Sequence, residues 1–360
     1  SKMGFRTIGT YILTTIIAVS IGLVVVNLVK PGSTITEETR AELVESYGGD
    51  AELKRQDAEK QKEAGPLQAL VDIVPSNIVG AAGSNANMLQ VIFFAIFFGI
   101  GLILIPEEQA EPVKKFFDGF NEVILKMIDI IMLTAPFGVF ALLAALVVEA
   151  PSADLFAALG MYALCVIGGL LLMIGVYTLL VWVFTKKTPS FFINGISPAQ
   201  LLAFSTSSSA ATLPVTMERV EEHLGVEKEV SSFVLPIGAT INMDGTSLYQ
   251  AVAAVFIAQA FGMDLDFGTQ LGIIATATLA SIGSAAVPGA GMVMLVIVLA
   301  QAGIPEAGLA LIFAIDRPLD MCRTTVNVTG DASVSMLVAK SVGKLREVPL
   351  VKNWNDNYKK

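Results

Sequence analysis

The feature that most constrains this chain is a series of long apolar stretches. Nearly uninterrupted apolar runs occupy residues 8–29, 91–105, 155–184 and 256–300. A helix needs roughly 20 apolar residues to cross the hydrocarbon core of a bilayer. The runs lack the period-two alternation that is typical of membrane barrels. The sequence therefore predicts an all-α polytopic membrane protein, whose backbone polar groups are satisfied within helices.

Composition and cysteine usage agree with this prediction. Hydrophobic residues make up 54% of the 360 residues and charged residues 15%, whereas soluble domains usually carry about 25% charged residues. The two cysteines, Cys165 and Cys322, lie in apolar surroundings, so no disulfide framework is indicated. The first apolar run is too long for a signal-peptide core and has no small-residue cleavage site, so we expect a membrane span.

Charge in the connecting segments predicts the orientation. Segments 151–154 and 263–270 contain no lysine or arginine. By the positive-inside rule these segments face outward and the basic segments face the cytoplasm. The acidic segment 36–65 is then an extracellular loop, which we expect to be solvated. The residues that mark the cytoplasmic side are Lys2, Arg6, Lys114, Lys115, Lys186, Lys187, Arg219, Lys228, Lys340, Lys344 and Arg346.

This topology requires two apolar segments to return to the side from which they enter. Residues 191–215 lie between two cytoplasmic basic groups and contain a Ser-Thr-Ser-Ser-Ser-Ala-Ala run at 205–211. Residues 271–303 are too long for one span, and their middle, 281–291, is rich in poor helix formers. The pattern indicates two re-entrant hairpins from opposite faces, as in inverted repeats whose transport site lies at interrupted helices.

A polar stripe marks the last apolar span. Burying a charge at bilayer depth costs at least ~2.5 kcal/mol, so these groups must face a cavity and one another. An ion-pair seam between helices is the less favoured reading, because a seam needs no broken helices nearby. Arg317 lies off the stripe and is predicted to flank it or to contact headgroups. Six residues share an arc of about 100°: Asp316, Asp320, Arg323, Thr324, Asn327 and Asp331.

Two further polar interruptions suit ions of opposite sign. Asn242, Asp244 and Gly245 interrupt an apolar span, which predicts an unwound helix whose oxygens suit an alkali cation. A simple kink would not explain Asp244, because a lone buried carboxylate is costly. The serine run offers hydroxyls and N–H groups at the start of a half-helix, which suit a carboxylate, although flexible loops have the same composition.

An enzyme is not expected. The chain has one histidine, His223, and this residue lies in a charged segment away from the serine run. A serine nucleophile would therefore lack a base, and no zinc, phosphate-loop or dinucleotide motif is present. No nucleic-acid partner is expected either.

Four motifs, in order and spacing across nearly the whole chain, closely resemble those of the dicarboxylate/amino acid:cation symporter family. This family includes the archaeal aspartate transporters and the excitatory amino acid transporters. The resemblance implies a glutamate-transporter-like fold with inverted repeats and two opposed re-entrant helical hairpins. It also implies a multi-pass homotrimer in the cell (inner) membrane, with a mobile transport domain that moves like an elevator against a fixed scaffold. The motifs are Ser207-Ser208-Ser209 with 212–214, then 242–246, 287–291 and 320–331.

The resemblance also implies a division of the chain. Residues 1–29 would be the family's third helix, 30–66 an extracellular loop, 67–150 scaffold helices and 151–187 a transport-domain span. The transport core, 188–360, would contain an inner hairpin (188–217), an unwound span (231–262), an outer hairpin (268–303), a last span (306–340) and a cytoplasmic tail.

Substrate contacts follow from the same resemblance. Arg323 would pair with a substrate side-chain carboxylate through its planar fork, and Asp320 would take the substrate amine. The other implied substrate contacts are Ser207, Ser208, Ser209, Thr246, Val287, Gly291, Thr324 and Asn327.

Two to three coupling sodium ions are implied as well. One site would use Gly238, Asn242, Asn327 and Asp331. A second would use Thr240, Met243, Ser281, Ile282 and Ser284. A third would use Tyr11, Thr14 and Thr15 with Asn242 and Asp244.

The chain departs from the family pattern in three places. It opens at what corresponds to the third family helix. The positions at which relatives carry an extra arginine are Ser207 and Met321, so we expect the contact of that arginine to be absent. Gln250 stands where mammalian carriers have a glutamate linked to proton and potassium coupling, so we expect coupling to sodium alone.

The leading hypothesis is a sodium-coupled symporter for aspartate or glutamate. The alternative is a proton- or sodium-coupled carrier of C4-dicarboxylates or neutral amino acids. Asp320 argues against a plain dicarboxylate, and Arg323 argues against a neutral substrate. An anion-channel side activity also stays open.

Overall fold

The computed structural model describes residues 2–39, 41, 74–83, 88–132, 137, 140–141, 153–282, 286 and 288–350. Every regular element in these ranges is a helix, and one isolated bridge joins Val226 to Leu345. The prediction of an all-helical chain is confirmed for these residues. Most of the predicted extracellular loop lies outside them, as do Ser284 and Val287.

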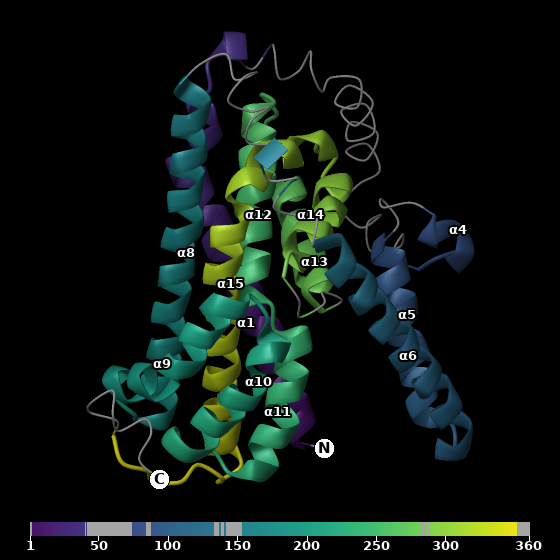
Figure 1. Cartoon of the computed structure of the whole chain (residues 1–360), viewed down its shortest axis with the longest axis vertical. Coiled ribbons are helices and arrows are strands. Elements are labelled where there is room, and N and C mark those ends of the chain that lie inside the picture. Colours follow the sequence, from purple (N-terminus) through teal and green to yellow (C-terminus); the bar gives the residue numbers. More distant parts are fainter. Residues whose placement is uncertain are drawn as a thin grey trace.

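Four helices run along the long axis of the molecule (Figure 1): α1 (Lys2–Val29), α8 (Ala153–Thr185), α12 (Asp244–Ala260) and α15 (Leu309–Ser341). Helix α12 contacts the other three. All of its residues except Gln259 are buried, because a helix that is apolar on every side has no face for water. The central helix thus carries its polar N-terminal residues into the interior.

Two helix pairs meet in the middle of this bundle. The α9 (Pro189–Thr206) and α10 (Ser209–Glu218) pair lies toward one end, and the α13 (Phe267–Ile282) and α14 (Ala290–Gln301) pair toward the other (Figure 1). The Ser208 hydroxyl donates to the Ala286 carbonyl at 2.6 Å. The tips of the two pairs therefore touch each other.

The predicted break in the serine run is present. Ser207 has a left-handed backbone (φ 52°, ψ 32°), which ends α9. The Ser208 side chain accepts a hydrogen bond from the Ala211 N–H at 3.1 Å and so caps α10. Serine suits this position because its oxygen satisfies an N–H that the first helical turn leaves free.

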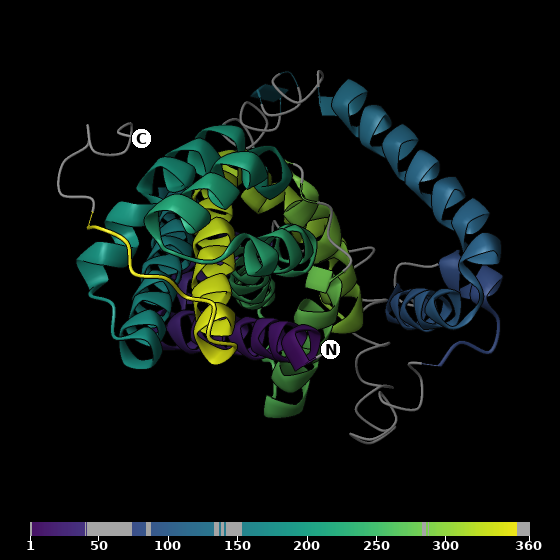
Figure 2. The ribbon, with the colours of Figure 1, turned by 90° about the horizontal axis from the view of Figure 1, so that it is seen from below.

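The remaining helices flank the core. Helices α5 (Met88–Leu104) and α6 (Glu107–Met132) stand apart from the bundle (Figure 2), with the short α4 (Ile78–Ala82) beside α5. Helix α5 contacts α13. Helix α11 (Lys228–Ile241) precedes α12, and short turns occupy Pro31–Thr34, Arg219–His223 and Glu306–Gly308.

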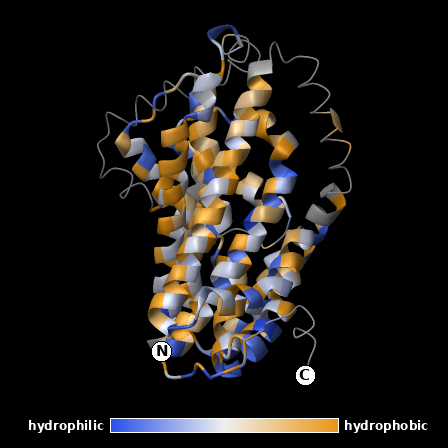
Figure 3. Cartoon of the chain, turned by 90° about the vertical axis from the view of Figure 1, so that its left-hand side faces the viewer, coloured by the Kyte–Doolittle hydropathy of each residue, from blue (hydrophilic) through white to orange (hydrophobic). Residues whose placement is uncertain are grey.

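Two helical segments of the described chain, Met3–Thr34 and Leu155–Thr185, are long and apolar enough to cross a membrane. Length and composition alone do not separate such segments from buried core helices. Their outward faces are nevertheless apolar (Figure 3): Leu13, Leu28, Leu171 and Leu172 are all more than half exposed. Lipid is a better solvent than water for such a surface.

Basic residues gather at the end of the bundle where α1 begins and α15 ends. Lys187 pairs with Glu347, and Lys344 pairs with Glu229. Arg6 Nη1 donates to the Ser341 carbonyl at 2.6 Å. The basic residues predicted to face the cytoplasm at positions 6, 187, 344 and 346 thus lie at one end of the bundle.

Candidate functional site

The break between α11 and α12 is the centre of the site. Asn242 has φ −87° and ψ 90°, and Met243 has φ −115° and ψ 46°, so helical geometry is interrupted for two residues. The Gly245 N–H donates to Asn327 Oδ1 at 2.8 Å. A Cβ at Gly245 would lie 2.5 Å from the Arg323 carbonyl oxygen, so glycine permits the close approach of α12 to α15. The predicted unwound span is confirmed.

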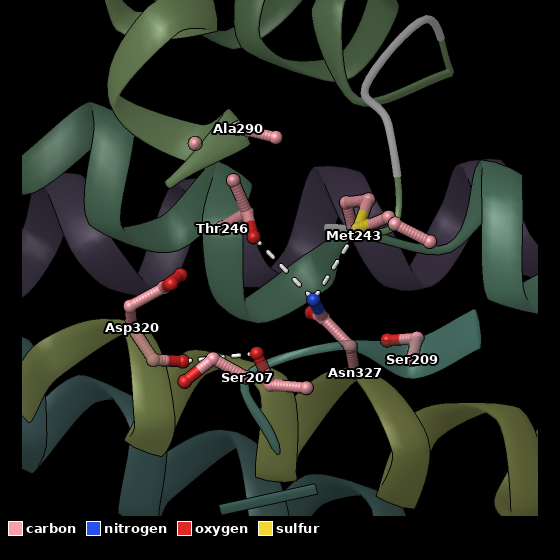
Figure 4. A pocket seen from close by; sticks show the side chains of 10 residues that line it. Ser207, Ser209, Met243, Thr246, Ala290, Asp320 and Asn327 are labelled. Atoms are coloured by element: carbon pink, nitrogen blue, oxygen red, sulfur yellow. Dashed lines mark hydrogen bonds between the residues drawn. The ribbon is translucent and has the colours of Figure 1, made fainter. Parts of the chain in front are cut away.

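A polar pocket opens where this break meets both helix-pair tips and α15. Asn327 lies in its middle (Figure 4): its Nδ2 donates to Thr246 Oγ1 at 3.4 Å and to Met243 Sδ at 3.3 Å. Hydroxyl, amide and carboxylate groups thus converge from segments far apart in the sequence. The residues that line the pocket are Ser207, Ser209, Met243, Thr246, Ala286, Ala290, Gly291, Asp320, Thr324 and Asn327.

Two ionic clusters lie beside this pocket. The arginine cluster consists of Asp316, Arg317, Asp320 and Arg323. The carboxylate cluster consists of Asp244 and Asp331 with Thr15, Tyr177 and Asn242.

Arg323 is the centre of the arginine cluster. Its guanidinium is fully buried, and donates to Asp316 Oδ1 and Asp320 Oδ1, each at 2.7 Å. It also lies over the ring of Tyr249, 3.9 Å from the centroid. A Cβ built at Gly291 would lie 3.6 Å from Arg323 Nη2, so the guanidinium is directly behind the pocket wall. A planar cation held in this way is a ready partner for a carboxylate.

Asp320 joins the arginine cluster to the tip of the α13–α14 pair. Its Oδ2 accepts from the Gly289 N–H at 3.0 Å and lies 3.6 Å from Arg317 Nη1. Arg317, which is predicted to flank the stripe, lies at its edge and also contacts Asp320, because residues three apart on a helix are neighbours and the arginine side chain is long. The predicted absence of an extra arginine concerns positions 207 and 321, which are Ser207 and Met321.

The carboxylate cluster contains two buried acids. The Thr15 hydroxyl donates to Asp244 Oδ1 at 2.6 Å, and the Tyr177 hydroxyl donates to Asp244 Oδ2. Asn242 Nδ2 donates to Asp331 Oδ1 at 2.9 Å. Within the described residues, neither carboxylate has a lysine or arginine partner. Two such charges are costly to bury without a cation.

Other oxygens surround this cluster. Asn242 Oδ1 is buried without a hydrogen-bond partner. A Cβ at Gly238 would collide with the Tyr11 hydroxyl and the Asp331 carboxylate, so the Gly238 backbone is directly against both. Buried Thr14 follows on α1 and donates to the Tyr11 carbonyl at 3.0 Å. The residues predicted for the first and third sodium sites therefore lie in one connected region.

The residues predicted for the second sodium site are arranged differently. Thr240 is exposed, and its hydroxyl donates to the Ile237 carbonyl at 3.0 Å. The buried Ser281 hydroxyl donates to the Thr278 carbonyl at 2.8 Å. Both hydroxyls are thus used within their own helices, while Ile282 ends α13 and is partly buried. This prediction is not tested further by the described residues.

Sequence reasoning missed two aromatic residues and one amide contact. Tyr177 and Tyr249 each lie beside another polar residue, Thr178 and Gln250, in a largely apolar helix, and this pattern does not identify a partner. The effect of Gln250 on ion coupling is predicted from the sequence, but its contact is not. Gln250 Nε2 donates to the Gly291 carbonyl at 3.2 Å. Each contact joins residues at least 41 positions apart, so no local pattern encodes it.

Comparison with known proteins identifies the family of this chain. The model of the sodium:dicarboxylate symporter family matches residues 1–341. The chain is 40% identical over 373 residues to excitatory amino acid transporter 1 of Ambystoma tigrinum, covering 92% of this chain and 68% of the relative. It is 37% identical over 376 residues to excitatory amino acid transporter 3 of Mus musculus, covering 94% and 72%. It is 38% identical over 366 residues to an excitatory amino acid transporter of Caenorhabditis elegans, covering 92% and 72%. The chain therefore belongs to the sodium:dicarboxylate symporter family, a family of membrane transporters.

Proposed function

We propose that this protein is a secondary active symporter that couples sodium influx to the uptake of an acidic amino acid, aspartate or glutamate. The observation that carries the proposal is one polar pocket close to a buried arginine and to two buried carboxylates that have no lysine or arginine partner among the described residues. The buried arginine suits an anionic substrate, and the two carboxylates suit a small cation. Membership of a sodium-coupled family supports the same pairing.

Recognition of the substrate would begin at Arg323. Its two ion pairs with Asp316 and Asp320 are within one helix, and a substrate side-chain carboxylate would replace one of them. Asp320 would then hold the substrate amine, because this carboxylate already lines the pocket. The remaining contacts would come from Ser207, Ser208, Ser209, Thr246, Val287, Gly291, Thr324 and Asn327.

Sodium would bind in the carboxylate cluster. Asp331 would share one ion with Gly238, Asn242 and Asn327. Asp244 would share another with Tyr11, Thr14, Thr15 and Asn242, and the contact of Tyr177 with Asp244 adds this residue to the set. A further ion would bind at the α13–α14 pair with Thr240, Met243, Ser281, Ile282 and Ser284. Carboxylate, carbonyl and hydroxyl oxygens are hard ligands, which suit such a cation.

Asn327 would couple the two solutes. Its side chain lies in the pocket, bonds to the Gly245 backbone and contacts Met243 in the helix break. An ion that fixes this amide and the break therefore prepares the pocket for substrate. By linkage, substrate must increase the affinity for sodium by the same factor.

The wider architecture belongs to the same proposal. The α9–α10 and α13–α14 pairs would be opposed re-entrant hairpins of an inverted repeat, the inner and outer gates of the site. The contact between Ser208 and Ala286 supports closed tips. Residues 67–150 would form a fixed scaffold and trimer interface, and residues 1–29, 151–187 and 188–360 would form a transport domain that moves as an elevator.

Uptake into proteoliposomes tests the proposal. We expect labelled aspartate to accumulate under an inward sodium gradient and to fail to accumulate under a pH gradient alone, because Gln250 cannot carry a proton. Accumulation driven equally by protons would contradict the sodium mechanism. Competition by succinate or serine as strong as competition by aspartate would favour the dicarboxylate or neutral amino acid alternative.

A further inference from the structure

Arg317 has no part in the proposed function so far, yet it reaches the site. It lies one helical turn before Asp320, and its Nη1 is 3.6 Å from Asp320 Oδ2. Its side chain is 48% exposed, whereas that of Asp320 is 8% exposed. Residues three apart on a helix are neighbours on its surface. The guanidinium therefore sits at the water-facing edge of a buried carboxylate.

Both carboxylate oxygens of Asp320 have partners. Oδ1 accepts from the fully buried Arg323 at 2.7 Å. Oδ2 accepts from the Gly289 backbone at 3.0 Å and faces Arg317. Among the described residues, these two arginines are the cations that pair with Asp320. The inner-tip residue Ser207 and the next residue on α15, Met321, carry no charge.

The charge count of the arginine cluster shows what Arg317 contributes. Asp316 and Asp320 supply two negative charges, and Arg317 and Arg323 supply two positive charges. Without Arg317 the cluster would carry a net charge of −1. An acidic amino acid also carries a net charge of −1 at neutral pH, so the altered cluster would repel it.

Substrate binding also affects the ion pair between Arg323 and Asp320. In the proposed function a substrate carboxylate replaces one of the two internal partners of Arg323, and Asp320 is one of these partners. A buried carboxylate left without a cation is strongly unfavourable. Arg317 contacts the other oxygen of Asp320, so it remains in place while Arg323 moves.

We propose that Arg317 is a positioning residue that holds Asp320 and compensates its charge, so that Arg323 is free to bind the carboxylate of an acidic substrate. This inference rests on the proposed function, because it assumes an acidic amino acid in the pocket. Arg317 acts through Asp320 and does not itself touch the substrate.

The experiment compares KM and Vmax for aspartate uptake in proteoliposomes at saturating sodium. We expect R317A to raise KM roughly fivefold, the size of a partly exposed ion pair, with little change in Vmax. R317K, which keeps the charge, should recover part of the loss. The matched control is K340A, which removes an exposed positive charge from the same helix near its C-terminal end. Its KM should equal that of the wild type.

A second variant separates charge compensation from a structural role. R317A combined with M321R returns a guanidinium to the neighbourhood of Asp320 and should restore most of the affinity. An unchanged KM in R317A, or a raised KM that M321R does not restore, would overturn the inference while leaving the proposed function intact. Absence of aspartate and glutamate uptake in the wild type would overturn both.

Discussion

The arginine cluster lies on α15 and the carboxylate cluster includes Asp331 of the same helix, yet the two clusters satisfy their buried charges in opposite ways. Arg323 is balanced by two carboxylates of its own helix, and Arg317 completes a neutral group. Among the described residues, Asp244 and Asp331 accept hydrogen bonds from hydroxyls and an amide and have no lysine or arginine partner. In the proposed function, a substrate carboxylate would replace one internal partner of Arg323, whereas a cation would offset the two carboxylates of the second cluster.

In the proposed function, this difference assigns the two clusters to different solutes. A carboxylate that enters the arginine cluster replaces an internal partner, so the arginine always has an anion. A cation that enters the carboxylate cluster relieves a desolvation cost that hydrogen bonds offset only in part. In the proposed function, α15 would therefore contribute to both sites, with Asn327 between them.

The largest expected effect comes from removal of Arg323, the residue proposed to bind the substrate carboxylate. R323A should lower aspartate uptake by roughly 100-fold or more, because truncation of one member of a buried charge pair costs about 2–5 kcal/mol. Uptake of aspartate and serine should be measured side by side. Serine uptake should be retained or increased, since serine has no side-chain carboxylate to lose. Parallel loss of both activities in well-folded protein would contradict the role of Arg323.

The second largest effect is expected from removal of one negative charge from the carboxylate cluster. D331N keeps the shape of the side chain and should raise the half-saturating sodium concentration about tenfold, because a charged oxygen ligand is lost. The maximal rate at saturating sodium should change less. The measurement is the sodium dependence of aspartate uptake. A shift in aspartate KM without any shift in sodium dependence would show that Asp331 belongs functionally to the arginine cluster instead.

Tyr177 provides a finer test of the same cluster. Y177F removes the hydroxyl that donates to Asp244 and should raise the half-saturating sodium concentration roughly fivefold, for the loss of about 1 kcal/mol of orienting hydrogen bonding. The matched control is Y162F on the same helix, where the tyrosine ring stacks on Phe256. Equal sodium dependence in both variants would show that Tyr177 has no role in sodium binding.

The smallest expected effect concerns the contact between the tips. S208A removes the cap of α10 and the bond to the Ala286 carbonyl, and should raise aspartate KM roughly threefold because such a cap contributes about 1 kcal/mol. S205A is the control, since the Ser205 hydroxyl donates within its own helix to the Leu201 carbonyl, 2.9 Å away. The same KM in both variants would mean that the tip contact is not part of substrate retention.

The helix breaks of the site could be predicted because their signals are local. Serines, glycines and polar residues inside apolar runs predict the interruptions at Ser207 and Asn242 and the end of α13 near Ile282. The polar stripe on α15 follows from helical periodicity alone. These predictions need no knowledge of what packs against each segment.

The long-range contacts could not be predicted in this way. A helical wheel treats side chains as points, so it placed Arg317 off the stripe although its length allows it to reach Asp320. Tyr177 is 67 residues from Asp244, and only the packing of α8 against α12 brings them together. The residue types at a helix break thus predict a polar site, while the residues that contact this site from other helices depend on tertiary packing.

The central claim is that the arginine and carboxylate clusters are energetically coupled. The most direct test is titration of purified protein with aspartate at a series of sodium concentrations at constant ionic strength. The account predicts that the logarithm of aspartate affinity rises with the logarithm of sodium concentration, with a slope between about two and three if that many ions bind together with the substrate. The same aspartate affinity in sodium and in an equal concentration of choline would contradict it.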